Sequence, residues 1–259
     1  MSIITLLTDL GYKDNFVGVM KGIILGINPK VHIVDLCHEV EPQDITGAAF
    51  ALKTAYKYFP KDTIHLVIID PGVGSQRLPI LVKTKDYYFI GPDNGVLSLA
   101  LEEQEIESII YLDNYEFHLR PVSNTFHARD IFAPVAVHLS KGISYQLFGK
   151  GIKDYKKIKL PKPIISSSSI VGEIIYMDRF GNLFTNISQD LRNKIKRPRI
   201  KIKDKLIRSI KSSYAQVKPN NLLAIWGSSG FLEIAVNLGS AKDKLIAKIG
   251  DKVEIIVDV

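Results

Sequence analysis

The chain has 259 residues, 46% of them hydrophobic and 24% charged, which is the composition of a globular protein with a sizeable core. Its formal net charge is +7, and its single cysteine, Cys37, excludes an internal disulfide framework and fits a reducing cytosol, so we expect a cytoplasmic protein. No run approaches the roughly 20 apolar residues of a membrane helix, and no signal peptide is visible, which predicts a protein without a membrane partner.

Strand and helix patterns alternate through residues 1–150, which we predict to form one α/β domain. Apolar runs predict strands, and apolar residues at helical spacing after capping residues predict helices. In chain order these are strand 3–7, helix 14–27, strand 31–36, helix 44–59, strand 63–69, a hairpin of strands 79–84 and 87–91, helix 94–103, strand 106–112 and helix 129–142. The alternation predicts a mostly parallel sheet flanked by helices.

The composition changes from residue 151. Residues 151–169 are rich in Lys, Pro and Ser, which predicts a linker. Short β-type runs separated by turn signals fill residues 170–259 and predict an all-β barrel domain. The expected strands are 170–178, 183–187, 199–207, 222–228, 231–237 and 252–257.

Three acids fall at the ends of the first three predicted strands: Asp9, Asp35 and Asp70. Ligands of open α/β sheets gather beyond the C-terminal ends of the strands. The sequence therefore predicts a polar crevice at this edge of the sheet.

The stretch 67-VIIDPGVGSQR-77 leads from the third of these acids through a glycine-containing loop to Arg77. It lacks the Gly-Lys-Ser/Thr ending of a phosphate loop, does not fit the dinucleotide fingerprint, and no helix obviously follows it. Two interpretations stay open: a turn in which Asp70 and Arg77 simply pair, or part of a catalytic site.

A second polar cluster, 123-SNTFHARDIFAP-134, brings His127, Arg129 and Asp130 together just before a predicted helix. These residues either cap and order the start of that helix, or they form part of a site. The second interpretation needs a partner for His127, and the crevice acids are the obvious source.

The stretch 35-DLCHEVEPQD-44 holds several residues of metal-binding types, but their spacing matches no zinc pattern. A nucleophilic role for Cys37 is disfavoured, because Glu39 and Glu41 oppose a thiolate. We therefore predict neither a metal site nor a bound cofactor.

Two stretches in the β part, 178-DRFGNLFTN-186 and 227-GSSGFLEIAVN-237, combine glycine turns with compact polar side chains. They are either ordinary strand turns or ligand contacts. Between them lies the basic segment 192–211, and residues 150–211 as a whole hold 17 Lys/Arg against 5 Asp/Glu. Because basic and apolar residues alternate there and aromatic residues to stack on bases are missing from 187–213, we expect a solvated strand face and no nucleic-acid partner.

Seven motifs then follow one another in a recognisable order: TDLGYKDNFVGVMKG, HEVEPQDITGAAFAL, VIIDPGVGSQR, FIGPDNGVLS, TFHARDIFAP, DRFGNLFTN and GSSGFLEIAVN. In this order the chain resembles the S-adenosylmethionine hydrolases, the hydroxide adenosyltransferases related to fluorinases and chlorinases. The resemblance extends from residue 3 to about residue 257. It implies an N-terminal α/β domain, a C-terminal β-barrel, and a homotrimer whose sites lie between subunits.

Carried over position by position, the resemblance implies a catalytic triad of Asp70, Arg77 and His127. It assigns Asp9 to the ribose hydroxyls and Asn182 to the adenine. The other implied substrate contacts are Asp14, Asp178, Ser228, Glu233 and Val236, of which Asp178 and Ser228 hold the methionine end.

The implied reaction is hydrolysis of S-adenosyl-L-methionine to adenosine and L-methionine, without a metal. The alternatives are a halogenase, and a non-catalytic protein that binds adenosine or nucleic acid. Halogenases carry other side chains at the positions of Asp70 and His127, so the intact triad favours water over halide. The chain departs from the family pattern at Ala128, where a glycine is expected, and at Cys37, where a hydroxyl residue is expected.

Overall fold

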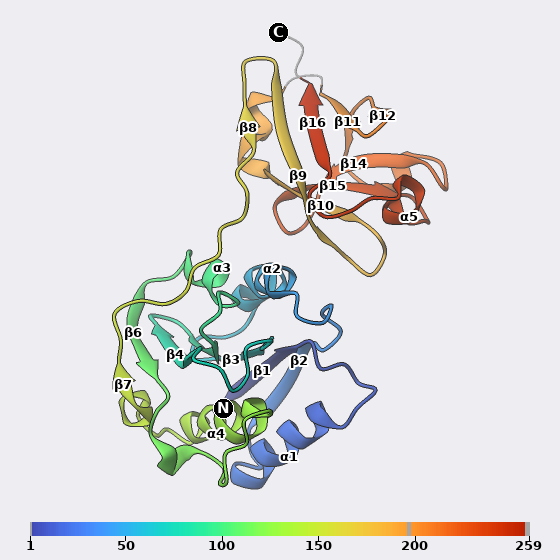
Figure 1. Cartoon of the computed structure of the whole chain (residues 1–259). Helices are drawn as coiled ribbons and strands as arrows, with labels where there is room; N and C mark the ends of the chain where they lie inside the picture. The colour runs from blue at the N-terminus through green and yellow to red at the C-terminus, as the bar shows by residue number, and fades with distance from the viewer. Residues whose placement is uncertain (1, 196–197, 257–259) are drawn as a thin grey trace. The chain divides into compact units, whose positions relative to one another are not determined.

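The computed structural model describes residues 2–195 and 198–256 (Figure 1). The chain divides into two compact units between Ile158 and Lys159. Each unit has its own sheet and its own core, so each is described by itself. The predicted basic segment includes positions 196–197 and the predicted last strand includes position 257, which lie outside the described residues.

The first unit is built on a seven-stranded sheet of order β2-β1-β3-β5-β4-β6-β7. Its strands are β1 (Ile3–Thr8), β2 (His32–Cys37), β3 (Ile64–Ile68), β4 (Pro79–Thr84), β5 (Tyr88–Pro92), β6 (Ile106–Tyr111) and β7 (Lys150–Gly151). Its helices are α1 (Phe16–Ile27), α2 (Ile45–Ala55), α3 (Ser98–Leu101) and α4 (Ala133–Ser140).

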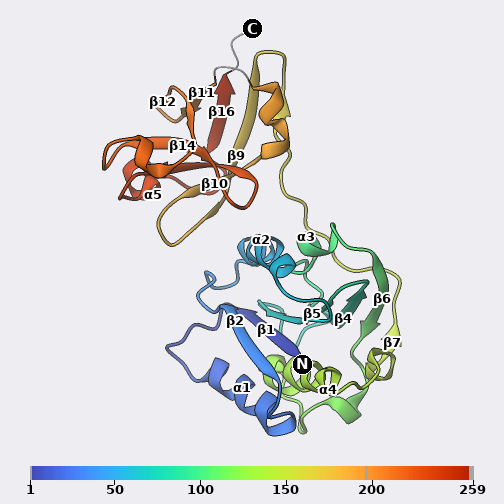
Figure 2. The same cartoon turned by 180° about the vertical axis from the view of Figure 1, so that it is seen from behind.

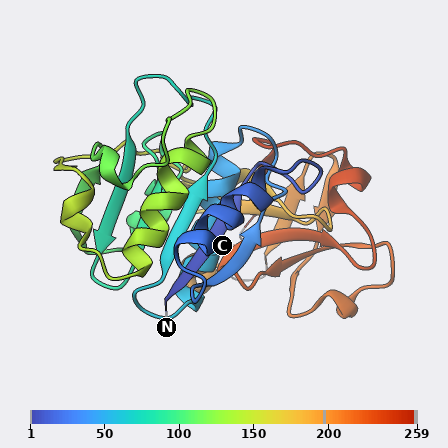
Figure 3. The same cartoon turned by 90° about the horizontal axis from the view of Figure 1, so that it is seen from below.

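Helices cover both faces of this sheet, as predicted. Helices α2 and α3 lie on one face and α1 and α4 on the other (Figures 1 and 2), and Figure 3 looks onto the face that α1 and α4 cover. Alternate residues of β3 point to opposite faces, so Leu66 packs in the core beneath α1 and α4, whereas Val67 packs in the core beneath α2. Both faces are therefore apolar, and polar side chains collect at the strand ends.

The sheet is mixed, which corrects the prediction of a mostly parallel one. Strands β2, β1, β3 and β5 run parallel to their neighbours, whereas β5 to β4, β4 to β6 and β6 to β7 are antiparallel. The turn between β4 and β5 is too short for a crossover helix, so these two strands form a hairpin. The three acids of the predicted crevice lie in the parallel part.

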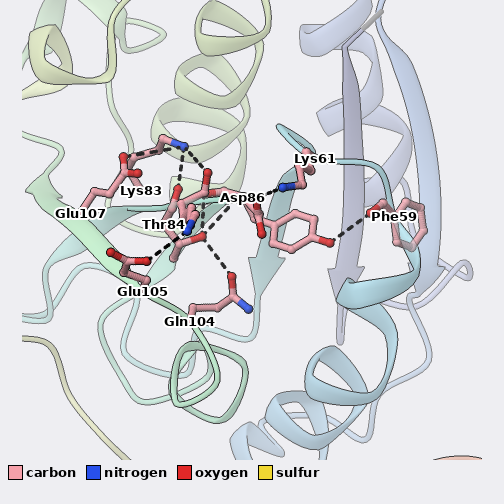
Figure 4. Close-up of polar contacts among 10 residues, drawn as sticks. Phe59, Lys61, Lys83, Thr84, Asp86, Gln104, Glu105 and Glu107 are labelled. Carbon is pink, nitrogen blue, oxygen red and sulfur yellow. Dashed lines mark hydrogen bonds and ion pairs between the residues drawn. The ribbon is translucent and has the colours of Figure 1, made fainter.

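A network of polar contacts closes the hairpin at the sheet end remote from those acids (Figure 4). The Lys83 ammonium donates to the carbonyl of Thr84 at 2.6 Å and lies 4.6 Å from the Tyr88 ring centroid. The Thr84 hydroxyl donates to the carbonyl of Tyr87 at 3.1 Å, and Lys61 pairs with Asp86 at 2.7 Å. These contacts tie the hairpin turn to the strands beside it.

The helix boundaries follow the sequence only approximately, and the predicted starts are no more accurate than the predicted ends. The Asp44 side chain accepts from the backbone N–H of Gly47 at 2.9 Å, as its predicted capping role requires. The predicted helix 44–59 continues after α2 as a 3₁₀ turn, Tyr56–Tyr58, and the predicted helix 94–103 is reduced to α3. The predicted helix 129–142 begins instead as a π-helical turn, Ala128–Phe132, that runs into α4.

The second unit is a single mixed sheet of order β12-β11-β16-β9-β10-β15-β14-β13, with β8 paired to β9. Its strands are β8 (Ile164–Ile165), β9 (Ser169–Met177), β10 (Leu183–Ser188), β11 (Arg199–Ile202), β12 (Lys205–Ile207), β13 (Ile210–Lys211), β14 (Leu222–Trp226), β15 (Phe231–Val236) and β16 (Lys252–Ile256). Residues of β12 lie beside β14, so the sheet curls around its core into a nearly closed barrel. The short helix α5 (Ala241–Leu245) and two 3₁₀ turns, Gln189–Lys194 and Tyr214–Gln216, are its described helical elements.

The predicted strand 199–207 is wrong, because the chain turns back at Lys203 and Asp204. Strands β11 and β12 form an antiparallel hairpin in which Ile202 pairs with Lys205. Lys203 adopts a left-handed backbone conformation, with φ of 51°, as tight hairpin turns require. The alternation of basic and apolar residues continues through the turn, so the pattern alone did not reveal it.

Candidate active site

The acids Asp9 and Asp70 lie at the same edge of the first sheet. Asp9 follows β1 directly, and Asp70 follows β3 after one intervening residue. The two strands are adjacent and parallel, and Thr8 pairs with Ile68. Asp35 lies inside β2, two residues before its end. The Asp9 carboxylate accepts from the backbone N–H of Gln43 at 2.8 Å. The ends of β1 and β3 therefore place Asp9 and Asp70 at one edge of the sheet, whereas Asp35, predicted at a strand end, lies within β2.

Asp70, Arg77 and His127 are in direct contact. Arg77 Nε donates to Asp70 Oδ1 at 2.8 Å, and Arg77 Nη2 donates to Asp70 Oδ2, so the pair is bidentate. The same Nη2 lies 2.8 Å from His127 Nδ1. The side chains of Asp70 and Arg77 are each only 8% exposed. Arg77 is thus the bridge between a carboxylate and an imidazole.

The glycines of the 70–77 loop let it approach the loop that carries His127. Gly74 has φ of 75°, and a Cβ there would lie 2.3 Å from the backbone oxygen of Asn124. Gly72 faces the Arg77 side chain, where an added Cβ would lie 3.3 Å from Cγ. Only glycine fits both the left-handed backbone and the close contact at position 74. Gly74 therefore allows the two loops to pair, whereas Gly72 leaves room for the Arg77 side chain within its own loop.

Ion pairing and stacking hold the residues around His127. Arg129 Nε donates to Asp130 Oδ1 at 2.6 Å, and the fully buried Asp130 accepts from the backbone N–H of Ser123 at 2.8 Å. Although burial alone raises the pKa of Asp130, the bonds from Arg129 and Ser123 outweigh it and lower that pKa. Phe132 lies beneath the Arg77 guanidinium, 5.3 Å from ring centroid to Cζ. Arg129 and Asp130 therefore order the loop that presents His127.

The contact with Arg77 fixes the tautomer of His127. A guanidinium is always a donor, so Nδ1 accepts and the ring proton of neutral His127 sits on Nε2. Burial, reinforced by the charge of Arg77, lowers the pKa of His127, so the ring is neutral at pH 7. Arg77 Nη1 is buried without a partner. Arg77 Nη1 is therefore an N–H donor of the triad that is left to bind an oxygen atom.

Asp14 is an exposed acid just before α1 and lines a surface depression of about 470 Å³. The residues around this depression are Tyr12, Asp14, Asn15, Val17, Gly18, Val19 and Lys21. Asp14 lies five residues after Asp9, so the N-terminal segment of the first unit contributes two carboxylates.

The second unit brings Asp178 and Asn182 together in the turn between β9 and β10. Asp178 Oδ1 accepts from the backbone N–H of Asn182 at 2.8 Å, and Oδ2 accepts from its side-chain amide, also at 2.8 Å. Gly181, with φ of 78°, packs against Ser240, where an added Cβ would lie 2.1 Å from Oγ. This turn is therefore rigid, and its polar side chains are mutually oriented.

Glu233 is a buried acid on the same unit, only 3% exposed. Its Oε2 accepts from the Tyr214 hydroxyl at 3.3 Å, and a Cβ added to Gly227 would lie 1.4 Å from Oε1. Burial, reinforced by the charge of Asp178, raises the pKa of Glu233 to about 7, although the Tyr214 bond opposes that rise. The pKa of Tyr214 is raised to about 12 by burial and by Glu233. Two acids, Asp178 and Glu233, thus interact electrostatically.

The remaining predicted contacts are less enclosed. Ser228 is exposed on the turn that joins β14 to β15, directly after Gly227. The Val236 side chain packs in the barrel core with Leu232 and Ile234, which leaves its backbone as the part that can reach a ligand. The buried Ser229 hydroxyl has no partner.

The sequence missed several residues that shape these sites. Phe132 and Asn124 support Arg77 and its loop, and Tyr214 is the partner of Glu233. None of the three carries a distinctive sequence signal, since each becomes visible only when remote segments pack.

The two positions that depart from the family pattern, Ala128 and Cys37, lie in the first unit. Ala128 is buried directly after His127, and the Cys37 sulfur accepts from the backbone N–H of Glu39 at 3.3 Å. Across residues 2–195 and 198–256 no group of three or more His, Cys, Asp or Glu side chains could hold a metal ion. Within the same ranges no helix is long and apolar enough to cross a membrane.

Two family models match the chain: the SAM hydroxide adenosyltransferase N-terminal domain over residues 4–149, and the C-terminal domain over residues 172–254. The chain is 36% identical to an (R)-S-adenosyl-L-methionine hydrolase of Methanocaldococcus jannaschii, over 99% of this chain and 96% of that protein. A fluorinase of Actinoplanes sp. is more distant, at 27% identity over 71% of each chain. A solved structure of an uncharacterized conserved protein from Thermotoga maritima is 41% identical with a TM-score of 0.92, over 98% of this chain and 99% of that one.

Proposed function

The chain belongs to the S-adenosylmethionine (SAM) hydroxide adenosyltransferase family, and on that premise we propose that it hydrolyses S-adenosyl-L-methionine to adenosine and L-methionine. The observation that carries the mechanism is the contact of Asp70, Arg77 and His127, which leaves the Arg77 Nη1 donor without a partner and able to hold one water molecule.

The reaction needs no general acid. The sulfonium leaves as a neutral thioether, so the leaving group needs no proton. The oxygen of water bonds to the ribose 5′ carbon while the carbon–sulfur bond breaks and its electron pair stays on sulfur. What the reaction needs is a water held in line and partly desolvated. Arg77 Nη1 supplies a donor that orients this water.

The tautomer of His127 determines the role of each residue of the triad. Because Nδ1 accepts from Arg77 and Nε2 carries the proton, neutral His127 has no free lone pair that could accept the water's proton. We therefore assign acceptance of the water's proton to the Asp70 carboxylate, with Arg77 holding that carboxylate in place.

We propose that acidic and amide side chains of both units bind the substrate. We assign Asp9 to the ribose hydroxyls, Asn182 to the adenine, and Asp178 and Ser228 to the methionine end. The two neighbouring acids Asp178 and Glu233 suit a ligand that carries an ammonium and a sulfonium charge. Asp14 and the backbone of Val236 complete the proposed contacts.

The family resemblance also supports a homotrimer whose sites combine residues of two subunits, and a reaction that needs no metal. We propose both the trimer and the metal-independent reaction for this chain.

The test is a product assay on purified protein without added metal. We expect adenosine and methionine in equal amounts, and in oxygen-18 water the label should appear on the adenosine 5′ oxygen. The variants Asp70→Ala, Arg77→Ala and His127→Ala should each lose about 10²-fold or more in rate. His32→Gln, at an exposed position at the start of β2, is the matched control and should keep the wild-type rate.

Other products would overturn the proposal. Methylthioadenosine, or bound substrate without turnover, contradicts hydrolysis at the 5′ carbon. Formation of 5′-chloro- or 5′-fluoro-deoxyadenosine after addition of chloride or fluoride would identify a halogenase.

A further inference from the structure

The segment that carries Asp9 is held on both sides by one buried histidine. His38, 1% exposed, follows β2 directly. Its Nδ1 lies 2.8 Å from the hydroxyl of Thr8, the residue before Asp9. Its backbone carbonyl accepts from the N–H of Gly11, two residues after Asp9, at 2.7 Å. His38 therefore clamps the short stretch in which Asp9 lies.

An acid holds the far side of the imidazole. His38 Nε2 lies 3.1 Å from Asp35 Oδ1, close to the carboxylate but without the alignment of a hydrogen bond. Lys21 donates to the other Asp35 oxygen at 2.6 Å, and Tyr12 also donates to it, at 3.0 Å. A lone pair on Nε2 would face this carboxylate unfavourably, so neutral His38 carries its proton on Nε2.

The tautomer fixes the direction of the remaining bonds. With the proton on Nε2, Nδ1 accepts, and the Thr8 hydroxyl is the donor. The lone pairs of that hydroxyl then accept from the backbone N–H of Leu10 at 3.2 Å. A bond from residue 10 back to residue 8 constrains the backbone at residue 9. The chain of contacts thus runs from Asp35 through His38 and Thr8 to the backbone at Asp9.

The arrangement has the residue types of a Ser-His-Asp catalytic triad, but it is not one. Thr8 is fully buried and its oxygen already accepts a backbone N–H, so it has no access to a substrate. What the contacts can do is hold a backbone.

We propose that Asp35 and His38 are positioning residues that aim the Asp9 carboxylate at the ribose hydroxyls of the nucleoside. This inference rests on the proposed function, in which Asp9 binds the ribose. Gln43 completes the arrangement, because its backbone N–H binds Asp9 Oδ2 and so restricts the carboxylate itself. The consequence is a preference for ribose over 2′-deoxyribose that depends on a histidine that does not itself touch the ligand.

The experiment measures binding of adenosine and of 2′-deoxyadenosine by titration calorimetry, together with kcat and KM for S-adenosylmethionine. The variants His38→Gln and Thr8→Val remove the Thr8–His38 bond from either side. We expect each to lose about 10-fold in affinity for adenosine, the worth of one hydrogen bond to a charged group, and clearly less for 2′-deoxyadenosine, which keeps only one of the two hydroxyls. KM should rise by a similar factor while kcat stays within about 3-fold.

The conservative variant Thr8→Ser keeps the hydroxyl and should restore the preference. Asp9→Asn should abolish it, and adding His38→Gln to Asp9→Asn should change nothing further, because both act through one carboxylate. His65→Gln is the matched control. His65 is a second buried histidine whose Nδ1 lies 2.8 Å from a threonine of β1, Thr5, within the strand rather than beside Asp9. It should lower stability and keep the preference.

The outcomes separate the two proposals. If the wild-type protein binds neither nucleoside and does not turn over the substrate, the proposed function fails. If the wild type prefers ribose and His38→Gln, Thr8→Val and Asp35→Asn all keep that preference, the positioning role alone is overturned. Equal losses for both nucleosides that follow the drop in melting temperature would assign His38 a purely structural role.

Discussion

Arg77 makes three contacts that no other side chain type could make together. Its planar guanidinium binds both oxygens of Asp70, reaches His127 Nδ1 with the same Nη2, and stacks on Phe132. Lysine keeps the charge but lacks the fork, the plane and the free Nη1. At this position, geometry matters more than charge.

We therefore expect Arg77→Lys to lower kcat by about 10²-fold although the net charge is unchanged. Steady-state kinetics with S-adenosylmethionine measures the effect. Arg208→Lys, at an exposed position of the second unit, is the control and should be neutral. Wild-type kcat in Arg77→Lys would mean that a positive charge alone suffices.

Glu233 links protonation to stability. The pKa of this buried acid is about 7 in the folded protein and near 4.5 when exposed, so between these values the folded state binds more protons than the unfolded state. The free energy of unfolding therefore gains from Glu233 below pH 4.5, and that gain is lost as the pH rises to 7.

The variant Glu233→Gln keeps the acceptor for Tyr214 without the charge. Relative to the wild type it should gain up to about 3 kcal/mol in unfolding free energy between pH 4.5 and pH 8. Urea unfolding of the ligand-free protein at a series of pH values gives this difference. Parallel curves for the two proteins would show that Glu233 titrates normally.

At the scale of elements, the pairing of the 70–77 loop with the His127 loop depends on Gly74. Gly74→Ala adds a left-handed strain of about 1 kcal/mol and a further 1–3 kcal/mol for the contact with the backbone of Asn124. Because the displaced loop carries Arg77, we also expect activity to fall by about 10²-fold.

Gly142 separates the two causes. It also has a left-handed backbone, with φ of 87°, but nothing lies within 4 Å of an added Cβ. Gly142→Ala should therefore cost about 1 kcal/mol in urea unfolding and leave activity intact. Equal behaviour of the two variants would show that the loop contact is unimportant.

Most strands, and the start of α2, could be predicted because their causes are local. Apolar runs bounded by turn residues gave β1, β3 and β15, and Asp44 caps α2 as its position suggested. The failures have non-local causes. The alternation of basic and apolar residues in 199–207 continues through the turn at Lys203. Strand β5 pairs antiparallel with its hairpin partner β4, which makes the sheet mixed.

At the scale of the whole molecule, the candidate site was predictable as a set of motifs but not as a geometry. Asp70 and His127 are 57 residues apart in the chain, and the order of seven motifs was what singled out Asp70 among the crevice acids as its partner. The sequence carried no sign that Asn124 would receive Gly74, or that Tyr214 would bind Glu233. Such contacts arise from packing between segments, which no local pattern encodes.

The proposed trimer makes a prediction about mixed subunits. Asp70→Ala damages the first unit of a chain and Asn182→Ala damages the second. If each site takes its first unit from one subunit and its second unit from a neighbour, random mixing at equal amounts leaves about a quarter of the sites intact. Co-expression of the two inactive variants should therefore restore about a quarter of wild-type activity. Co-expression of Asp70→Ala with Arg77→Ala is the control, because both changes fall in the first unit and no site can then be intact. Activity no higher than that of the separate variants in the first mixture would place each site within a single chain.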